Sequence, residues 1–173
     1  MISLISGKYK GKKLYPFKNK YVRPTQAKIR KSIFQILEPF TELEILDLYA
    51  GVGTMGLEAL SRGANRVVFV EKDRQVSKIL YKNLNLFKNE KLEVYCMDVD
   101  HYITRNSYDR FDIIFADPPY TIENFKYLKE KVQFFLKPRG IFCMEMKRQL
   151  IDDENIRIKY YGNTQVVFFR GNI

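Results

Sequence analysis

The chain has 173 residues, of which 46% are hydrophobic and 29% are charged, and its formal net charge is +10. That length fits one domain with its own core, and the composition excludes a disordered or a fibrous chain. No apolar run approaches the ~20 residues that cross a bilayer, and the first ten residues lack the long apolar stretch of a signal peptide, so we expect a cytoplasmic protein with no membrane partner.

The positive charge is concentrated at one end of the chain. Residues 1–40 hold ten Lys or Arg and one acid, a net charge of +9, whereas the other 133 residues carry +1. A basic surface beside a neutral body is typical of a protein with a polyanionic partner, although a solvated arm without a specific partner is the alternative. We therefore divide the chain into a basic N-terminal extension, residues 1–40, and a body, residues 41–173.

The extension is predicted to form a β-hairpin followed by a helix. Residues 2–5 and 12–15 are strand-like and are joined by a turn between Gly7 and Gly11. Apolar residues then recur at helical spacing over 29–37 until Pro39 ends the helix, and Thr25 is a candidate N-cap.

The body alternates strands with helices. The pattern predicts strands at 45–48, 66–70, 92–96, 111–116 and 141–144, with helices between them. This alternation predicts an α/β fold with a doubly wound, mostly parallel sheet. Residues 156–161 and 165–170 flank Gly162-Asn163 and predict a closing hairpin that adds antiparallel strands at one edge.

The two cysteines, Cys96 and Cys143, each lie in an apolar, strand-like run. We expect both to be buried free thiols in a reducing cytoplasm.

A glycine-rich loop follows the first strand of the body. Asp47 precedes Gly51-x-Gly53-x-x-Gly56, and Glu71 ends the next strand, 20 residues after Gly51. Glycines let the backbone approach a ligand closely, and ligands of open α/β sheets bind beyond the carboxyl ends of the strands. The spacing predicts a nucleotide cofactor whose ribose hydroxyls are held by Glu71.

The same spacing fits the dinucleotide fingerprint for NAD. However, Asp47 is well placed to bind the ammonium of a methionine moiety and has no obvious function beside a pyrophosphate. The body also leaves little room for the substrate domain of a dehydrogenase. Further along the chain, Asp98 ends the third strand, where it would bind the adenine amino group, cap the next helix, or do both. The candidate S-adenosylmethionine-binding residues are Asp47, Ala50, Gly51, Gly53, Gly56, Glu71, Lys72, Met97, Asp98 and Asp117.

The fourth strand runs directly into Asp117-Pro118-Pro119-Tyr120, which we interpret as the catalytic motif. An exocyclic amine on a base is a poor nucleophile, and its two hydrogens could be held by the Asp117 carboxylate and the Pro118 carbonyl, which the prolines fix in direction. Tyr120 offers a flat face on which an extruded base can stack. An ordinary proline-rich turn with an unremarkable Asp is the alternative. The chemistry needs no metal, and the sequence offers no His/Cys cluster for one.

These motifs resemble those of a known family. Residues 47–64, Glu71 and Asp117-Pro-Pro-Tyr120 are similar to class I methyltransferases that act on amino groups. Residues 5–14 (ISGKYKGKKL), with Arg23-Pro24-Thr25 and Arg30, are similar to the RsmD family of bacterial 16S ribosomal RNA guanine-N2 methyltransferases, and the resemblance runs from about Ile2 to Phe169. The departures from the family pattern lie near the expected cofactor, at Val52, Thr54, Met55 and Val99.

The resemblance implies a Rossmann-like, seven-stranded sheet with an antiparallel last strand, S-adenosylmethionine as methyl donor, and one methyl group added to a guanine amine. It also implies that the hairpin and helix of the extension hold RNA, in agreement with the charge distribution. The candidate RNA-binding residues are Lys8, Lys10, Lys12, Lys13, Arg23, Thr25, Lys28 and Arg30.

The expected partner is therefore 16S ribosomal RNA or the small ribosomal subunit, and we expect a monomer. Two alternatives stay open at this point. A DNA adenine-N6 methyltransferase would use the same Asp-Pro-Pro-Tyr chemistry, although such enzymes usually carry an added recognition domain. A non-catalytic RNA-binding protein could also keep this fold.

Overall fold

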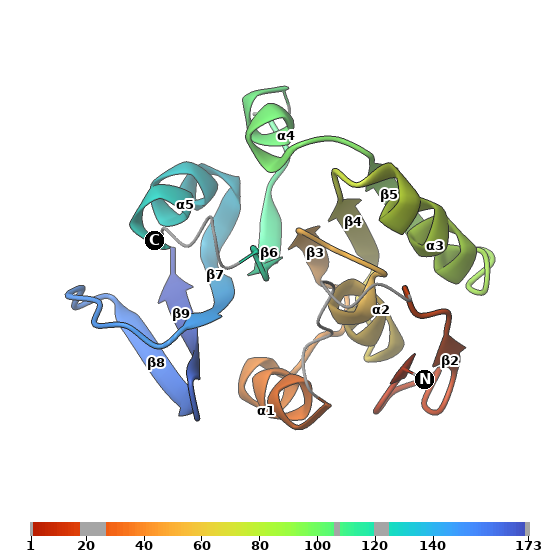
Figure 1. Cartoon of the computed structure of the whole chain (residues 1–173), viewed down its shortest axis with the longest axis horizontal. Helices are drawn as coiled ribbons and strands as arrows, with labels where there is room; N and C mark the ends of the chain where they lie inside the picture. The colour runs from red at the N-terminus through yellow and green to blue at the C-terminus, as the bar shows by residue number, and fades with distance from the viewer. Residues whose placement is uncertain (1, 18–26, 106–107, 120–124, 172–173) are drawn as a thin grey trace.

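The computed structural model describes residues 2–17, 27–105, 108–119 and 125–171 (Figure 1). The elements, in chain order, are β1 (Ile2–Ser3), β2 (Lys13–Leu14), α1 (Ala27–Leu37), β3 (Glu44–Leu48), α2 (Thr54–Ser61), β4 (Arg66–Val70), α3 (Arg74–Leu84), β5 (Lys91–Tyr95), α4 (Val99–Arg105), β6 (Phe111–Ala116), α5 (Phe125–Val132), a 3-10 turn (Gln133–Phe135), β7 (Leu136–Lys147), β8 (Ile156–Tyr161) and β9 (Thr164–Arg170).

The main sheet has seven strands in the order β5-β4-β3-β6-β7-β9-β8. The first five are parallel, and β9 is antiparallel to both β7 and β8. Strands β3 and β4 are each buried over their last four residues, because helices cover both faces of a parallel sheet. The predicted fold is confirmed, and the closing hairpin places the chain's last strand inside the sheet, with β8 at the edge.

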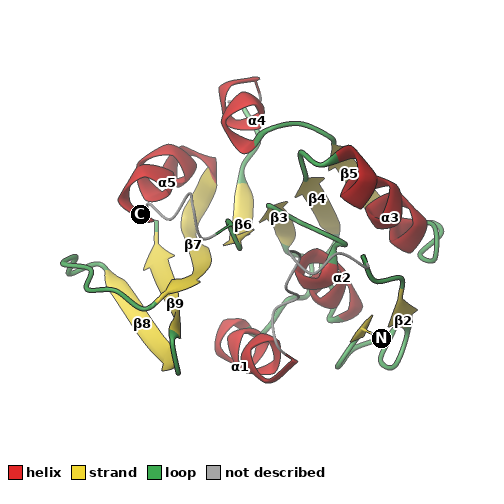
Figure 2. Cartoon of the chain, viewed as in Figure 1, coloured by secondary structure: helices red, strands yellow, loops and turns green. Residues whose placement is uncertain are grey.

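The helices are arranged around the sheet as Figure 2 shows. Two hydrophobic clusters, one on each face, hold them against it. Helices α1, α2 and α3 contribute Phe34, Leu57 and Leu80 to one cluster, while α4 and α5 contribute Tyr102 and Leu128 to the other. The first cluster also contains Leu4 and Leu14 of the β1–β2 hairpin. The N-terminal extension therefore packs on the same core as the body, and the division at residue 40 remains a prediction about function.

Several predicted boundaries shift in the structure. The strand predicted at 141–144 is much longer, because β7 runs over Leu136–Lys147, and the hairpin strands β1 and β2 are only two residues each. Cys143 is buried as expected, but the expectation for Cys96 is wrong, since that side chain is exposed. Cys96 directly follows β5, which lies at the edge of the sheet and is covered only in part. Thr25 lies outside the described residues.

Within the described residues, no helix has both the length and the apolar character that a membrane span requires.

Candidate functional site

Three neighbouring parallel strands end level with one another. In the register of the sheet, Leu48 of β3 lies opposite Val70 of β4 on one side and opposite Ala116 of β6 on the other. The residues that follow these strand ends are Tyr49, Glu71 and Asp117. Two acids predicted for the site are thus brought to the same edge of the sheet, on either side of the strand that leads into the glycine loop.

The glycine loop between β3 and α2 adopts a backbone that only glycine tolerates well. Gly51 and Gly53 have φ values of 58° and 86°, in the left-handed region. A Cβ on Gly51 would meet no atom within 4 Å, so this part of the loop faces open space, whereas a Cβ on Gly53 would lie 2.6 Å from Leu80. Ala50 closes the turn by accepting a hydrogen bond from the Gly53 amide.

Gly56 has a packing function rather than an open face. It lies in the first turn of α2, where an added Cβ would come within 2.4 Å of the Phe69 ring. Its amide donates to Asp47 Oδ2 at 2.8 Å, and the contact is buried. We therefore do not retain Gly56 as a direct cofactor contact: it lets α2 approach β4 and fixes Asp47.

Asp47 lies beneath the glycine loop and is only 3% exposed. Burial, opposed by the hydrogen bond from Gly56 and assisted by the charges of Asp117 and Glu71, raises the pKa of its carboxyl to about 8. The charges of two acids act on a third, so the three acidic side chains lie near one another. A cationic ligand at this place would stabilise their ionised forms.

Glu71 ties the loop to the end of β4. Its Oε2 accepts from the Gly51 amide at 2.9 Å, and its Oε1 accepts from the Asp73 amide at 2.8 Å. Each carboxylate oxygen keeps a further lone pair, so the half-buried side chain can still accept hydrogen bonds from two hydroxyl groups. This geometry agrees with the predicted role of Glu71.

The remaining cofactor candidates lie around the end of β5 and the start of α3. Asp98 accepts from the Asp100 amide at 2.9 Å, so it caps α4, and its exposed position leaves it accessible as well. Met97 is half-buried beside the second core cluster, and Lys72 is exposed.

The catalytic motif follows β6, one of the two neighbours of β3. Asp117 is half-buried and Pro118 is buried, and the charge of Asp117 acts on Asp47. The structure therefore brings Asp117 to the glycine-loop side of the sheet, as the predicted chemistry requires. Tyr120 lies outside the described residues.

Tyr49 is a residue of the site that sequence reasoning missed. It follows β3, between the strand ends that lead to Glu71 and Asp117, and its φ is 56°. A positive φ is unusual for a bulky residue, and backbone strain of this kind clusters at functional sites. Burial, followed by the charges of Asp100 and Asp98, raises the pKa of its hydroxyl to about 12. Only its position after a strand could have indicated it, because backbone strain leaves no pattern in the sequence.

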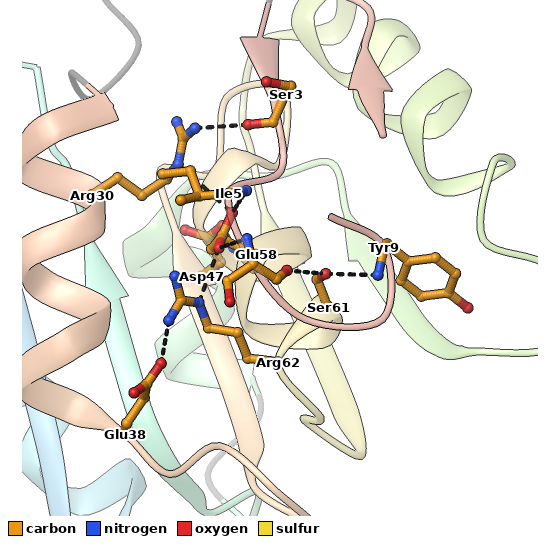
Figure 3. Close-up of polar contacts among 11 residues, drawn as sticks. Ser3, Ile5, Tyr9, Arg30, Glu38, Asp47, Glu58, Ser61 and Arg62 are labelled. Carbon is orange, nitrogen blue, oxygen red and sulfur yellow. Dashed lines mark hydrogen bonds and ion pairs between the residues drawn. The ribbon is translucent and has the colours of Figure 1, made fainter. Parts of the chain in front are cut away.

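A buried polar cluster attaches the N-terminal extension to α2 (Figure 3). The Glu58 side chain is fully buried and accepts from the Ile5 amide at 2.8 Å, from the Ser6 amide at 3.1 Å and from Arg62 Nε at 2.9 Å. One turn later, Ser61 Oγ accepts from the Tyr9 amide at 3.0 Å. The carboxylate of Glu58 and the hydroxyl of Ser61 therefore hold the hairpin in place.

Arg30 belongs to this cluster, and its predicted RNA contact must be corrected. The side chain is 3% exposed, its Nη2 donates to the Ser3 carbonyl at 2.9 Å, and its Nε lies 3.9 Å from Glu58 Oε2. Burial lowers its pKa, and the charge of Glu58 opposes that shift. Arg30 stabilises the docking of α1 and the hairpin, so we remove it from the RNA-binding set.

The other basic candidates that the structure describes are on the surface. Lys8, Lys10, Lys12, Lys13 and Lys28 are all exposed, and Lys8 also forms a 2.8 Å ion pair with Glu90. Arg23 and Thr25 lie outside the described residues.

Asn83 is a second residue that the sequence did not indicate. It is fully buried and accepts from the Tyr15 amide at 2.7 Å, while its Nδ2 donates to the Tyr15 carbonyl at 3.1 Å and to the Val52 carbonyl at 2.9 Å. One side chain on α3 thus joins the end of the hairpin to the glycine loop. In the sequence, Asn83 stands out only as an Asn inside an amphipathic helix, and that pattern does not predict which residues it contacts.

Comparison with known proteins agrees with this geometry. A family model described as "Conserved hypothetical protein 95" matches residues 2–170. The chain is 31% identical over 180 residues to "Ribosomal RNA small subunit methyltransferase D" of Haemophilus influenzae, covering 98% of this chain and 92% of that protein. It is also 31% identical over 179 residues to "Putative rRNA methyltransferase YlbH" of Bacillus subtilis, covering 96% and 97% of the two chains.

Solved structures give the same result for the fold. "Putative methyltransferase yhhF" from Escherichia coli superposes with a TM-score of 0.86 at 27% identity, covering 99% of this chain and 98% of that one. An RNA methyltransferase from Salinibacter ruber, solved with S-adenosyl-L-homocysteine, shares the fold with a TM-score of 0.67 at 15% identity, over 87% and 94% of the two chains. The chain therefore belongs to the RsmD family, the family of ribosomal RNA small subunit methyltransferase D.

Proposed function

We propose that this protein transfers a methyl group from S-adenosylmethionine to the exocyclic N2 amine of a guanine in the 16S RNA of the small ribosomal subunit. Methylation of ribosomal RNA agrees with the names of the curated relatives. One observation supports an exocyclic amine as the acceptor of the methyl group. Asp117 and Glu71 follow the ends of two strands that lie level, on either side of the strand that enters the glycine loop, so the proposed catalytic acid and the proposed ribose ligand lie at the same edge of the sheet.

The residues present fit S-adenosylmethionine. Gly51 leaves open space above the loop, and Glu71 stands beside it with acceptor capacity for a ribose. The charges of Glu71 and Asp117 act on Asp47, and a ligand that carries a sulfonium and an ammonium would stabilise the ionised forms of all three acids. We propose a reaction that uses no metal ion, because a methyl group on a sulfonium is already electrophilic.

The bound donor supplies an electrophilic methyl group, and the side chains of this protein position the nucleophile. We assign Asp117 and the Pro118 carbonyl as acceptors for the two hydrogens of the amine, so that its lone pair points towards the donor. As the nitrogen gains positive charge, the nearby Asp117 carboxylate stabilises it, and this kind of preorganised stabilisation is usually the largest single contribution to catalysis. The fixed backbone of Pro118 and Pro119 keeps the acceptor from turning away.

The extension supports a polynucleotide substrate. Buried side chains hold the hairpin against α2, and five lysines of the predicted RNA-binding set are exposed. We propose that these lysines contact phosphates and bring the cytoplasmic ribosomal substrate to the glycine-loop edge of the sheet. We propose that the protein acts as a monomer.

The test is methyl transfer from labelled S-adenosylmethionine to 16S RNA and to small subunits that lack the modification, followed by mass spectrometric mapping of the labelled nucleotide. We expect one N2-methylguanosine. Label on duplex DNA alone would instead favour an adenine-N6 methyltransferase, and binding of RNA without transfer to any substrate would favour a non-catalytic RNA-binding protein. A labelled base other than guanine would contradict only the choice of guanine as the target and would leave RNA methylation as the activity.

A further inference from the structure

We infer that the exposed face of α3 is part of the RNA-binding surface and contacts phosphates beside those held by the hairpin. The inference rests on the proposed function and extends it to an element that neither the charge map of the sequence nor the resemblance to a family indicated.

The first observation is a basic stripe. Arg74, Lys78 and Lys82 follow one another at intervals of four residues, which places them on one face of the helix, and all three are exposed. The helix contains no Asp or Glu, and in the part of the chain that the structure describes none of these three side chains forms an ion pair. Like charges at this spacing destabilise a helix by about 0.2–0.5 kcal/mol per pair, so the stripe does not help α3 to form.

The nearby acids are occupied by other contacts. Asp73 accepts from the Gln75 and Val76 amides as the N-cap of α3, and Glu71 holds the Gly51 and Asp73 amides. At the other end, Glu90 binds Lys8 and Tyr9 of the hairpin. The positive charge of the stripe therefore faces solvent.

The second observation is that aromatic side chains accompany the stripe. Tyr15 and Tyr81 are 49% and 48% exposed, and Lys82 Nζ lies 5.6 Å from the centre of the Tyr15 ring. Lysines that surround exposed aromatic rings are the arrangement with which proteins hold unpaired nucleotides, since the rings stack on bases and the lysines neutralise phosphates.

The third observation is the position of this face. The hairpin and α3 lie side by side (Figure 1), joined by Asn83 to Tyr15 and by the edge contact of Tyr9 on Phe87. Lys12 Nζ lies 6.0 Å from the same Phe87 ring, so a hairpin lysine reaches the segment that follows α3. Because Asn83 also binds Val52 of the glycine loop, α3 and the end of the hairpin are both attached to the loop of the proposed cofactor site.

The experiment compares two variants that lose the same charge. Lys78→Ala/Lys82→Ala removes two lysines from the stripe, and alanine keeps the helix stable. Arg157→Ala/Lys159→Ala removes two exposed basic side chains from β8, at the opposite edge of the sheet. Binding to in vitro transcribed 16S RNA and to small subunits that lack the modification is measured between about 50 and 200 mM KCl, over which phosphate contacts strongly affect affinity.

We expect the α3 variant to lower the slope of log K against log salt by about 1.5, because each lost phosphate contact lowers it by ~0.7–0.9. The β8 variant should keep the slope of the wild type, and both variants should bind S-adenosylmethionine as the wild type does. A slope in the α3 variant equal to that of the wild type, or an equal fall in both variants, would show a merely solvated face or a general effect of net charge and would overturn the inference.

The proposed function fails separately. If the wild type methylates neither RNA substrate, the proposed function is wrong whatever the slopes show. If the wild type methylates RNA and the α3 variant keeps its slope, only the inference about α3 is wrong.

Discussion

At the ligand end of the sheet, the polar contacts join residues that are near in the sequence. Asp47 binds Gly56 nine positions later, and Glu71 binds Gly51 twenty positions earlier. The N-terminal extension is held by contacts of much longer range, because Glu58 binds Ile5 at a separation of 53 and Asn83 binds Tyr15 at a separation of 68.

This difference assigns different tasks to the two regions. The ligand end needs a fixed geometry around reacting groups, and short loops on a rigid sheet provide it. The extension needs to hold a basic surface in one place, and buried acceptors on α2 and α3 provide that at the cost of burying polar groups. Substitutions at the ligand end should change catalysis, whereas substitutions in the docking contacts should change stability and the binding of RNA.

The largest expected effect is on turnover. Asp117→Ala should lower the rate of methyl transfer by about 10²–10³-fold, because it removes the acceptor beside the developing positive charge. Calorimetry should show that S-adenosylmethionine still binds. Asp117→Asn, which keeps an acceptor but loses the charge, should retain more activity, and full activity in Asp117→Ala would contradict the catalytic assignment.

The next effect concerns stability. Glu58→Gln should lower the free energy of unfolding by about 3 kcal/mol, because Arg30 and Arg62 would keep buried charges without their acid. Glu38→Gln is the matched control, since Glu38 pairs with the same Arg62 but its side chain is 50% exposed, and it should cost less than about 1 kcal/mol. Urea denaturation measures both, and equal losses would show that burial of Glu58 is unimportant.

Asn83→Ala tests the link between the two regions. It leaves Tyr15 and Val52 without their buried partner and should destabilise the protein by about 2 kcal/mol. It should also weaken S-adenosylmethionine binding, because Val52 belongs to the glycine loop. Asn85→Ala, at an exposed position two residues later, should change neither quantity. A destabilised Asn83 variant with the cofactor affinity of the wild type would mean that the residue supports the fold alone.

The smallest effect, per pH unit, is the dependence of stability on pH. Burial raises the pKa of Asp47 from 3.8 to about 8, so between these values the folded protein holds a proton that the unfolded chain has lost. The contribution of this carboxyl to stability is therefore complete below pH about 4 and is lost as pH rises towards 8, by at most about 1.4 kcal/mol per pH unit.

Asp47→Asn should remove that dependence, because the amide stays neutral. Urea denaturation of both proteins at several pH values gives the difference between their slopes, in which the shared titrating groups cancel. Parallel slopes would show that Asp47 is already charged in the folded protein.

Local signals predicted the elements of the body well. The alternation of apolar strands and amphipathic helices gave β4 and β6 with their observed bounds. The glycine spacing and the Asp-Pro-Pro run identified the loops at the strand ends, because such backbones need particular residue types. These features could be recognised because each depends on residues within one short segment.

The sequence by itself therefore determined the fold class, the glycine loop and the acids at the ends of β4 and β6. Only the tertiary structure decided that Arg30 is buried beside Glu58 and that Asn83 spans two regions. It also brought the basic stripe of α3 beside the hairpin, although the charge map had placed nearly all of the excess charge in residues 1–40. The physical reason is that burial and pairing of a charged side chain depend on partners tens of residues away, which no local pattern encodes.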